Sequence, residues 1–130
     1  MFALGIDGGG SRTRALLCDT LGHIIGQGLS GGTNPRTSTT EELKIHLQEA
    51  IEQATRSIDC SKIIAAHFGL AGAGEADTRA KVRTITKELL GKQTACTIGH
   101  DLEIALAGGL ANKSGIVLVA GTGSACYGRT

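Results

Sequence analysis

The chain has 130 residues, which is enough for one small domain with a sizeable core, and its formal net charge is +1. Its basic residues form no run and have no aromatic residues among them, so we expect neither nucleic acid nor a membrane surface as a partner. No secretion signal opens the chain and no apolar run approaches the roughly 20 residues that span a bilayer, so we expect a cytoplasmic protein.

The composition also indicates how the core is built. Because the chain holds only two Phe, one Tyr and no Trp, its core must consist of aliphatic side chains, as is typical of a sheet covered by helices. Four cysteines are spread widely along the chain and form no Cys-x-x-Cys pair: Cys18, Cys60, Cys96 and Cys126. We expect them to be reduced and mostly buried thiols.

The first part of the chain predicts a meander of three strands, followed by a loop and a helix. The loop contains the only proline of the chain. Apolar residues at helical spacing from Leu43 to Ile58 follow two acidic residues, which marks the helix and its start. The predicted elements are strands over 2–7, 13–19 and 23–29, a loop over 30–36 and a helix beginning at Thr40.

The second part predicts alternating strands and helices, so the fold class is α/β with a mixed sheet in the order β-β-β-α-β-α-β-α-β. The predicted elements are strands over 62–70, 94–98 and 115–120 and helices over 76–90 and 102–111. The run 115–120 is apolar throughout, which is typical of a central strand with partners on both sides. We expect no later strand in this chain to pair with it.

A glycine-rich turn follows the first strand, and it is the clearest candidate for an anion site. Its residues are Asp7, Gly8, Gly9, Gly10, Ser11, Arg12 and Thr13. Successive glycines let backbone N–H groups approach phosphate oxygens, and Asp7 would hold Mg²⁺ there, through water. The next element is a strand, so the turn is neither a Walker A loop nor a dinucleotide fingerprint. The alternative is an ordinary hairpin with an exposed Asp.

A second glycine-rich turn follows the 115–120 strand. Its residues are Gly121, Thr122, Gly123 and Ser124. The hydroxyl groups of Thr122 and Ser124 could also reach a phosphate, although the alternative of a plain turn stays open.

Asp101 lies between the two turns in the sequence, at the point where a predicted strand hands over to a predicted helix. Ligands of open α/β sheets collect at the carboxyl ends of strands, and a carboxylate there can accept a proton from a substrate hydroxyl that attacks phosphorus. The alternative, compatible role is the N-cap of the following helix. We interpret His100 as a structural residue.

Two loops are further candidates for substrate contacts. Asn34 could bind a sugar hydroxyl, or it could simply form a turn next to Pro35. The glycines over 69–74 have the wrong spacing for a dinucleotide site, so this segment is either a loop on the substrate side or a plain turn.

Taken together, these motifs resemble the N-acetylglucosamine kinases and the wider BadF/BadG/BcrA/BcrD ATPase group of the actin/hexokinase/Hsp70 superfamily. The motifs that carry the resemblance are Gly5–Thr13, Thr33–Asn34, Gly69–Gly72, His100–Asp101 and Gly121–Ser124. Their order and spacing agree with the family over essentially the whole chain.

The resemblance implies transfer of a phosphoryl group from ATP, with Mg²⁺, to a hydroxyl of an amino sugar. It places Ser11 and Thr122 at the hydroxyl positions of two phosphate loops. It makes Asp101 the catalytic base and Asn34 a sugar ligand, and it puts Ser124 near the sugar. It implies no iron–sulfur cluster, because nothing in the chain suggests the cysteine ligands found in the reductase-activator branch.

The resemblance also implies a ribonuclease H-like mixed sheet of the actin-like ATPase type, of which this chain holds the first lobe only. Residues 1–112 would form that lobe, and residues 113–130 would be the opening strand and phosphate turn of a second lobe. We therefore expect little or no kinase activity from the 130-residue chain alone. The alternatives are a sugar-sensing regulator, an ATPase that acts on a partner, or an inactive fragment; a homodimer also stays open.

Overall fold

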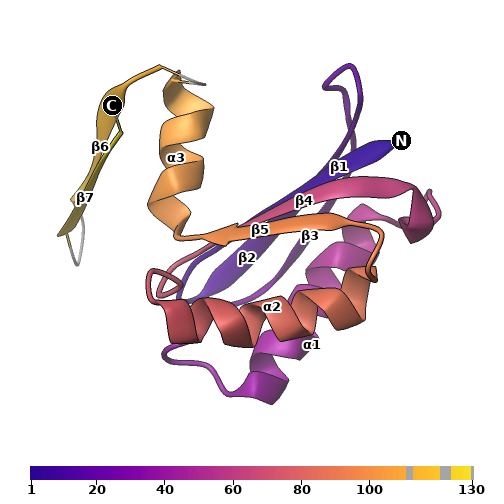
Figure 1. The fold of residues 1–130 in the computed structure, drawn as a ribbon, viewed down its shortest axis with the longest axis horizontal. Coiled ribbons are helices and arrows are strands. Elements are labelled where there is room, and N and C mark those ends of the chain that lie inside the picture. Colours follow the sequence, from indigo (N-terminus) through magenta and orange to yellow (C-terminus); the bar gives the residue numbers. More distant parts are fainter. Residues whose placement is uncertain (111–112, 121–123, 130) are drawn as a thin grey trace.

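The computed structural model describes residues 1–110, 113–120 and 124–129 (Figure 1). Its elements follow the predicted order, with one additional strand at the end. They are β1 (Phe2–Gly8), β2 (Arg12–Asp19), β3 (Ile24–Gly31), α1 (Thr40–Ala54), η1 (Cys60–Lys62), β4 (Ile63–Leu70), α2 (Ala76–Leu90), β5 (Ala95–Gly99), α3 (Asp101–Leu110), β6 (Gly115–Ala120) and β7 (Ser124–Arg129).

A five-stranded mixed sheet with the order β3-β2-β1-β4-β5 forms the centre of the fold. The strands β1, β2 and β3 make the predicted antiparallel meander, and β4 and β5 run parallel to β1. Because β1, β4 and β5 share one direction, their carboxyl ends meet at one edge of the sheet, where Gly8 lies beside Leu70 and Gly69 beside Gly99. This edge is where ligands of such sheets collect.

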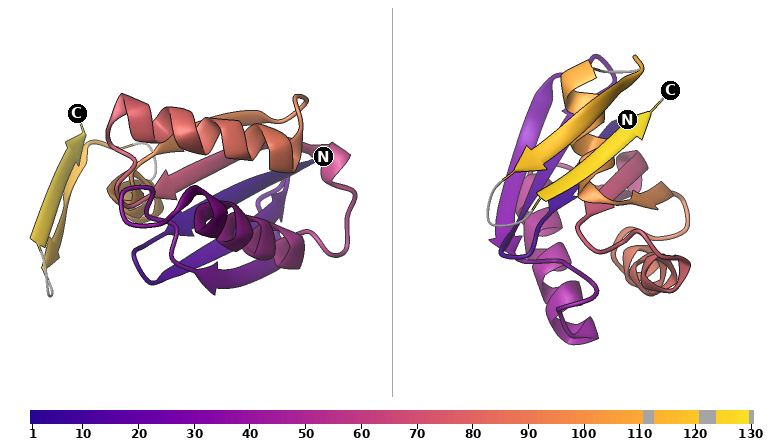
Figure 2. Two further views of the ribbon diagram at one scale, coloured as in Figure 1. Left: turned by 90° about the horizontal axis from the view of Figure 1, so that it is seen from below. Right: turned by 90° about the vertical axis from the view of Figure 1, so that its left-hand side faces the viewer.

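The two helices α1 and α2 cover one face of this sheet (Figure 2). The core between them is aliphatic, as predicted, with Phe68 as its one fully buried aromatic side chain among the described residues. Burial alternates along β1, where Leu4 and Ile6 point into this core. Because successive side chains of a strand point to opposite faces of the sheet, every second residue of β1 faces the helices and the others lie on the second face.

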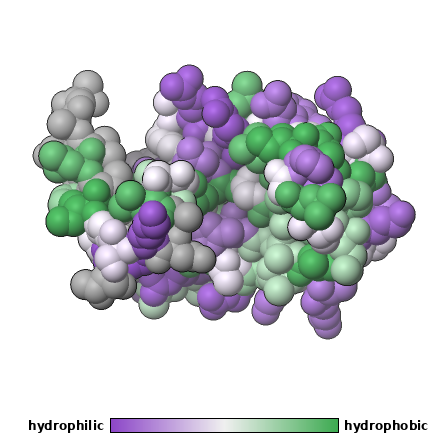
Figure 3. Space-filling model, turned by 90° about the horizontal axis from the view of Figure 1, so that it is seen from above, coloured by the Kyte–Doolittle hydropathy of each residue, from purple (hydrophilic) through white to green (hydrophobic). Residues whose placement is uncertain are grey.

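The second face is covered only in part, by α3. The side chain of Ile104 lies against Gly69 and, with Gly5 and Leu16, lines a small cavity of about 210 Å³ on this face. Figure 3, which views this face from the side opposite α1 and α2, shows a cluster of apolar residues on one part of it and hydrophilic residues beside them. No helix in the described ranges is long and apolar enough to cross a membrane.

The hairpin β6–β7 is a separate two-stranded antiparallel sheet, which contradicts our expectation that no strand follows the second glycine turn. The segment 124–129 lacks the aliphatic run that marks the other strands, so its pattern did not indicate a strand. Solvent reaches the apolar side chains of Ile116 and Leu118, which are 72% and 71% exposed. The hairpin thus buries far less apolar surface than the main sheet.

Three smaller expectations were also inaccurate. The apolar stripe predicted that helix α1 extends to Ile58, but it ends at Ala54, where the hydroxyl of Thr55 donates to the Ile51 carbonyl. Ile58 still packs against the core. Helix α3 begins at Asp101, one residue earlier than predicted. All four cysteines are free, but three are half-buried and Cys126 is exposed, so the expectation of mostly buried thiols was wrong. Three of them lie on strands, and neighbouring elements cover them only partly.

Candidate functional site

The glycine-rich turn between β1 and β2 is held by backbone hydrogen bonds on several sides. The Gly9 N–H donates to the Arg12 carbonyl at 2.9 Å and closes the turn. The Thr33 N–H donates to the Gly9 carbonyl at 3.0 Å, and the Ala71 N–H donates to the Gly8 carbonyl at 2.8 Å. Segments after β3 and β4 therefore fix the turn in place.

The members of this turn differ in what they offer to a ligand. Gly10, Ser11 and Arg12 are exposed at its tip, so their backbone and side-chain donors are accessible. Thr13 is buried, and its hydroxyl donates to the Gly31 carbonyl at 2.8 Å and lies 2.7 Å from the Thr33 hydroxyl. The hydroxyl of Thr13 is thus engaged within the fold, whereas that of Ser11 is open to a ligand.

A cavity of about 460 Å³ brings this turn together with Asp101. Its lining consists of Asp7, Gly9, Arg12, Thr13, Arg14, Leu29 and Asp101. The two carboxyl groups come from the end of β1 and the start of α3, and the two guanidinium groups come from β2. The sequence analysis grouped Asp7 with the glycine turn, and the structure adds Asp101 to the same cavity.

The two carboxylates influence each other. Partial burial raises the pKa of Asp7, the negative charge of Asp101 raises it further, and Arg14 opposes the shift. A divalent cation between the two groups would relieve this repulsion, and carboxylate oxygens are the ligands that Mg²⁺ takes from proteins. No cluster of three or more acidic, His or Cys side chains suited to a metal occurs among the described residues. The donor set therefore fits a cation that keeps most of its water or shares phosphate oxygens.

Asp101 is the first residue of α3 and follows β5 after a single residue, His100. It is half-buried, and among the described residues its carboxylate accepts no hydrogen bond. The ring of His100 packs edge-on against Tyr127 with 4.6 Å between the ring centroids, and its Nε2 lies 3.6 Å from the Glu103 carboxylate. The Nδ1 of His100 is buried and has no hydrogen-bond partner among the described residues, so the structural role of His100 stays a prediction.

A second cavity of about 330 Å³ lies on the other side of Asp101. It is lined by Arg36, Gly72, Gly74, Glu75, His100, Asp101, Leu102, Cys126 and Tyr127. Asp101 thus borders two cavities, one with the glycine turn and one with the loops that precede α1 and α2. Such an arrangement suits a carboxylate that acts between two substrates.

Asn34 does not line this second cavity itself, but it forms a turn against two residues that do, Arg36 and Gly72. Its Oδ1 accepts the Arg36 N–H at 2.9 Å, and its backbone carbonyl accepts the N–H groups of Thr37 and Ser38. Gly72, which has a φ of 82°, packs against the same Oδ1. The turn role of Asn34 is therefore real, and its Nδ2 has no hydrogen-bond partner among the described residues.

The sequence analysis missed three charged residues at the site: Arg14, Arg36 and Glu75. A signal existed for Arg14, because strand alternation places it on the side of β2 that carries Arg12 and opposite Asp7. Arg36 and Glu75 lie on different loops, and no local sequence pattern connects them. In the structure the Arg36 Nη1 lies 3.7 Å from the Glu75 Oε1.

Residues Gly121, Thr122 and Gly123 lie outside the described residues, so their assignment to a phosphate turn stays a prediction. Ser124 begins β7, where its backbone pairs with that of Ala120.

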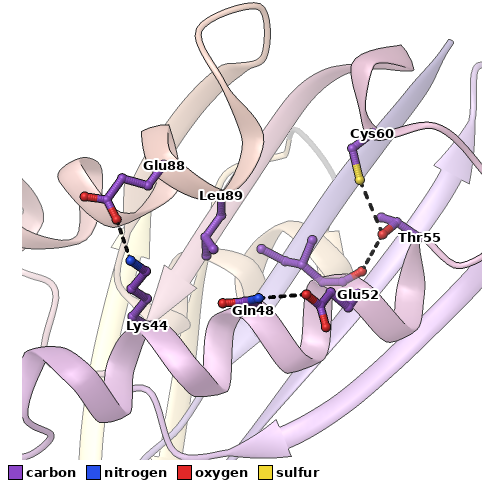
Figure 4. A pocket seen from close by; sticks show the side chains of 8 residues that line it. Lys44, Gln48, Glu52, Thr55, Cys60, Glu88 and Leu89 are labelled. Carbon is purple, nitrogen blue, oxygen red and sulfur yellow. Dashed lines mark hydrogen bonds and ion pairs between the residues drawn. The ribbon is translucent and has the colours of Figure 1, made fainter.

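A third cavity, of about 380 Å³, lies between α1 and α2 and has a different character (Figure 4). The ammonium group of Lys44 pairs with Glu88 at 2.8 Å, and the Gln48 amide donates to Glu52 at 2.7 Å. Its polar side chains thus satisfy one another. It also lies between the helices, away from the strand ends that carry Asp7 and Asp101.

Comparison with known proteins points to one family. The model of the BadF/BadG/BcrA/BcrD ATPase family matches residues 4–129. An N-acetylmuramic acid/N-acetylglucosamine kinase of Clostridium acetobutylicum is 35% identical over 133 residues, and the alignment covers 98% of this chain and 42% of that protein. The chain thus spans less than half of the length of this curated relative.

Solved structures show the same fold. A crystal structure from Porphyromonas gingivalis, described as an N-acetylglucosamine kinase, has a TM-score of 0.81 at 21% sequence identity. The match covers 97% of this chain and 44% of that protein chain. A ROK family glucokinase from Streptomyces griseus, in complex with glucose and AMPPNP, has a TM-score of 0.69 at 20% sequence identity. That match covers 97% of this chain and 43% of the glucokinase chain. The predicted fold class, the first lobe of an actin-like mixed α/β sheet, is confirmed.

Proposed function

Because the chain belongs to the BadF/BadG/BcrA/BcrD ATPase family, we propose that it forms the nucleotide- and sugar-binding first lobe of an ATP-dependent amino-sugar kinase. The observation that carries the proposal is the position of Asp101, which borders both the cavity of the glycine turn and the cavity beside Asn34. Residues 1–112 would make up this lobe, residues 113–130 would open a second lobe, and the protein would act in the cytoplasm.

The glycine turn would bind the terminal phosphates of ATP. The backbone N–H of Gly10 and the hydroxyl of Ser11 are the donors. Gly9 closes the turn by donating its own N–H to the Arg12 carbonyl, and Gly8 keeps the turn compact beneath them. The guanidinium groups of Arg12 and Arg14 face the same cavity and balance the phosphate charge. In the second lobe, Gly121, Thr122 and Gly123 would bind the phosphates from the opposite side.

Magnesium fits the carboxyl groups on this side of the cavity. Asp7 would hold it through water, and Asp101 lies near enough to influence the charge of Asp7. When bound, the cation would neutralise part of the negative charge on the phosphate oxygens.

Asp101 would act as the general base. Its carboxylate accepts the proton of the sugar hydroxyl while the hydroxyl oxygen forms a bond to the γ-phosphorus and the bond to the ADP oxygen breaks. Because the Asp101 carboxylate accepts no hydrogen bond from the described residues and borders both cavities, it can reach a hydroxyl in one cavity and a phosphate in the other.

The second cavity would bind the sugar. Asn34 packs against the lining residues Arg36 and Gly72, and its Nδ2, which has no partner among the described residues, would bind a sugar hydroxyl. Ser124, at the start of β7, would lie near the sugar. The relative from Clostridium acetobutylicum acts on N-acetylmuramic acid and N-acetylglucosamine by its name, which supports an amino sugar as the substrate.

The test is ATP consumption by the complete gene product that contains this chain, with Mg²⁺ and with N-acetylglucosamine, N-acetylmuramic acid, glucosamine or no sugar. We expect consumption that depends on a sugar, and a loss of about a thousandfold in kcat for Asp101→Asn with the KM for ATP nearly unchanged. Hydrolysis without sugar dependence would support an ATPase instead, and sugar binding without ATP consumption would support a sensor. The 130-residue chain alone should be nearly inactive, because lobe closure aligns the reactants and excludes water.

A further inference from the structure

A short segment at the end of β3 lies directly behind the glycine turn. The Gly32 backbone packs against the Gly10 carbonyl so closely that a side chain on Gly32 would not fit. Next to it, Thr33 donates its N–H to the Gly9 carbonyl at 3.0 Å, and its buried hydroxyl lies 2.7 Å from that of Thr13. The position of residues 31–33 therefore determines where the backbone of Gly9 and Gly10 lies.

His46, on helix α1, holds this segment from the other side. Its Nδ1 lies 2.7 Å from the Gly32 carbonyl oxygen. A carbonyl oxygen only accepts, so Nδ1 carries the proton and donates it in this hydrogen bond. The imidazole ring also packs against Gly31, where an added Cβ would come within 2.5 Å of the ring carbon Cε1. The ring thus both supports the segment and fixes the direction of one of its carbonyl groups.

The Gly32 carbonyl depends on this contact because of where β3 ends. The ladder with β2 stops at the pair of Arg12 and Gly31, so Gly32 has no strand partner. Without the imidazole, the half-buried carbonyl would lose its hydrogen bond, and the peptide could rotate. Gly10, which packs on that peptide, would move with it.

We propose that His46 is a positioning residue of the nucleotide site, which sets the phosphate-binding amides of the glycine turn through the peptide of Gly32. This inference rests on the proposed function, because it assigns the turn to the phosphates of ATP. His46 itself touches no substrate. It acts through the geometry of the donors, because a misplacement of about 1 Å can already cost about a hundredfold in rate.

The matched control is a second hydrogen bond between the same two elements. The hydroxyl of Ser30 donates to the backbone carbonyl of His46 at 2.6 Å, which joins β3 to α1 without engaging Gly32. If His46 only docks the helix, Ser30→Ala and His46→Leu should have the same consequences. If His46 sets the turn, only His46→Leu should affect the nucleotide.

The experiment compares His46→Leu, His46→Asn and Ser30→Ala in the complete gene product. We expect His46→Leu to raise the KM for ATP and the Kd for MgATP about tenfold, with the KM for the sugar within about twofold. His46→Asn, whose amide places a donor near the position of Nδ1, should restore most of the affinity. Ser30→Ala should lower Tm and leave the KM for ATP unchanged.

Amide hydrogen exchange over residues 8–13 provides a readout that does not depend on catalysis. We expect faster exchange there in His46→Leu than in Ser30→Ala at matched stability. Equal exchange in the two variants, or equal increases of both KM values, would overturn the proposal. If the wild-type protein shows no sugar-dependent ATP consumption, the proposed function fails, while exchange and MgATP affinity still decide the role of His46. If His46→Leu does not fold, His46→Gln takes its place, because its amide nitrogen lies near the position of Nε2 and leaves the Gly32 carbonyl without a donor. It should raise the KM for ATP relative to His46→Asn, and equal KM values in these two variants would overturn the proposal.

Discussion

The two sides of Asp101 are built in different ways. On the side that we propose for the phosphates (the phosphate side), backbone hydrogen bonds from residues after β3 and β4 hold the glycine turn, and Thr13 and Thr33 behind it are 1% and 0% exposed. On the side that we propose for the sugar (the sugar side), the loops before α1 and α2 meet through one glycine with positive φ and through the exposed pair of Arg36 and Glu75.

This difference has a physical consequence. Buried hydroxyls and paired backbone groups leave the phosphate side a single low-energy arrangement, which is what a preorganised anion site needs. Exposed charges contribute little to stability, so the sugar side can change its side chains without loss of fold. We therefore expect substitutions on the phosphate side to affect folding and nucleotide together, and substitutions on the sugar side to affect mainly the sugar.

The largest effect is expected for Gly8→Ala. A Cβ at Gly8 would collide with the Thr33 hydroxyl and come within 2.6 Å of a Leu70 methyl group. We expect the free energy of unfolding to fall by about 2–3 kcal/mol, measured by denaturant titration, with loss of MgATP binding. Gly10→Ala is the matched control, because nothing lies within 4 Å of its added Cβ. Equal stabilities of the two variants would contradict the tight packing of the phosphate side.

A smaller loss is expected for Gly72→Ala on the sugar side. Gly72 has a φ of 82° and packs against the Oδ1 of Asn34. The strained backbone should cost about 1–2 kcal/mol of stability, and displacement of Asn34 should raise the KM for the sugar more than the KM for ATP. Gly74→Ala, with open space around its added Cβ and an ordinary φ, should leave the stability unchanged and is the matched control for the backbone strain. A rise in the KM for ATP alone would contradict the assignment of this side to the sugar.

Asp7→Asn should stabilise the protein when metal and nucleotide are absent. Burial and the Asp101 charge raise the pKa of Asp7, so the folded state binds a proton there more tightly than the unfolded state. The contribution of Asp7 to stability is therefore complete at acidic pH and is lost as the pH rises through its raised pKa. At neutral pH we expect Asp7→Asn to raise Tm by about 2 °C, and the difference from wild type should vanish at acidic pH. A lower Tm at neutral pH would show that Arg14 outweighs the other two effects.

The smallest effect on stability is expected for Arg36→Ala. The side chains of Arg36 and Glu75 are 62% and 69% exposed, and their charged atoms are 3.7 Å apart. Removal of this pair should change the free energy of unfolding by less than about 0.5 kcal/mol. Because Arg36 lines the cavity beside Asp101, the KM for the sugar should still change, and Glu75→Gln tests the partner. Unchanged sugar kinetics in both variants would remove this cavity from the sugar site.

Local patterns predicted most of the elements and the glycine-rich turn after β1. The apolar stripe of α1, the strand alternation of β1 and β2 and the glycine run after Asp7 are all readable over a few residues, because each depends on a short period or a turn. Where the local signal was weak, the sequence alone did not predict the element or its bounds, as for strand β7, the end of α1 and the start of α3.

The combination of groups around Asp101 depends on the tertiary structure. Arg14 joins the site because β2 lies antiparallel to β1 in the register that puts it opposite Asp7. Arg36 and Glu75 join it because two loops about 40 residues apart in the sequence meet at one edge of the sheet. The support of the glycine turn by His46 likewise depends on how α1 packs across β3. Strand order and helix packing create these neighbours, and they arise from the burial of the whole core rather than from any short stretch of the chain.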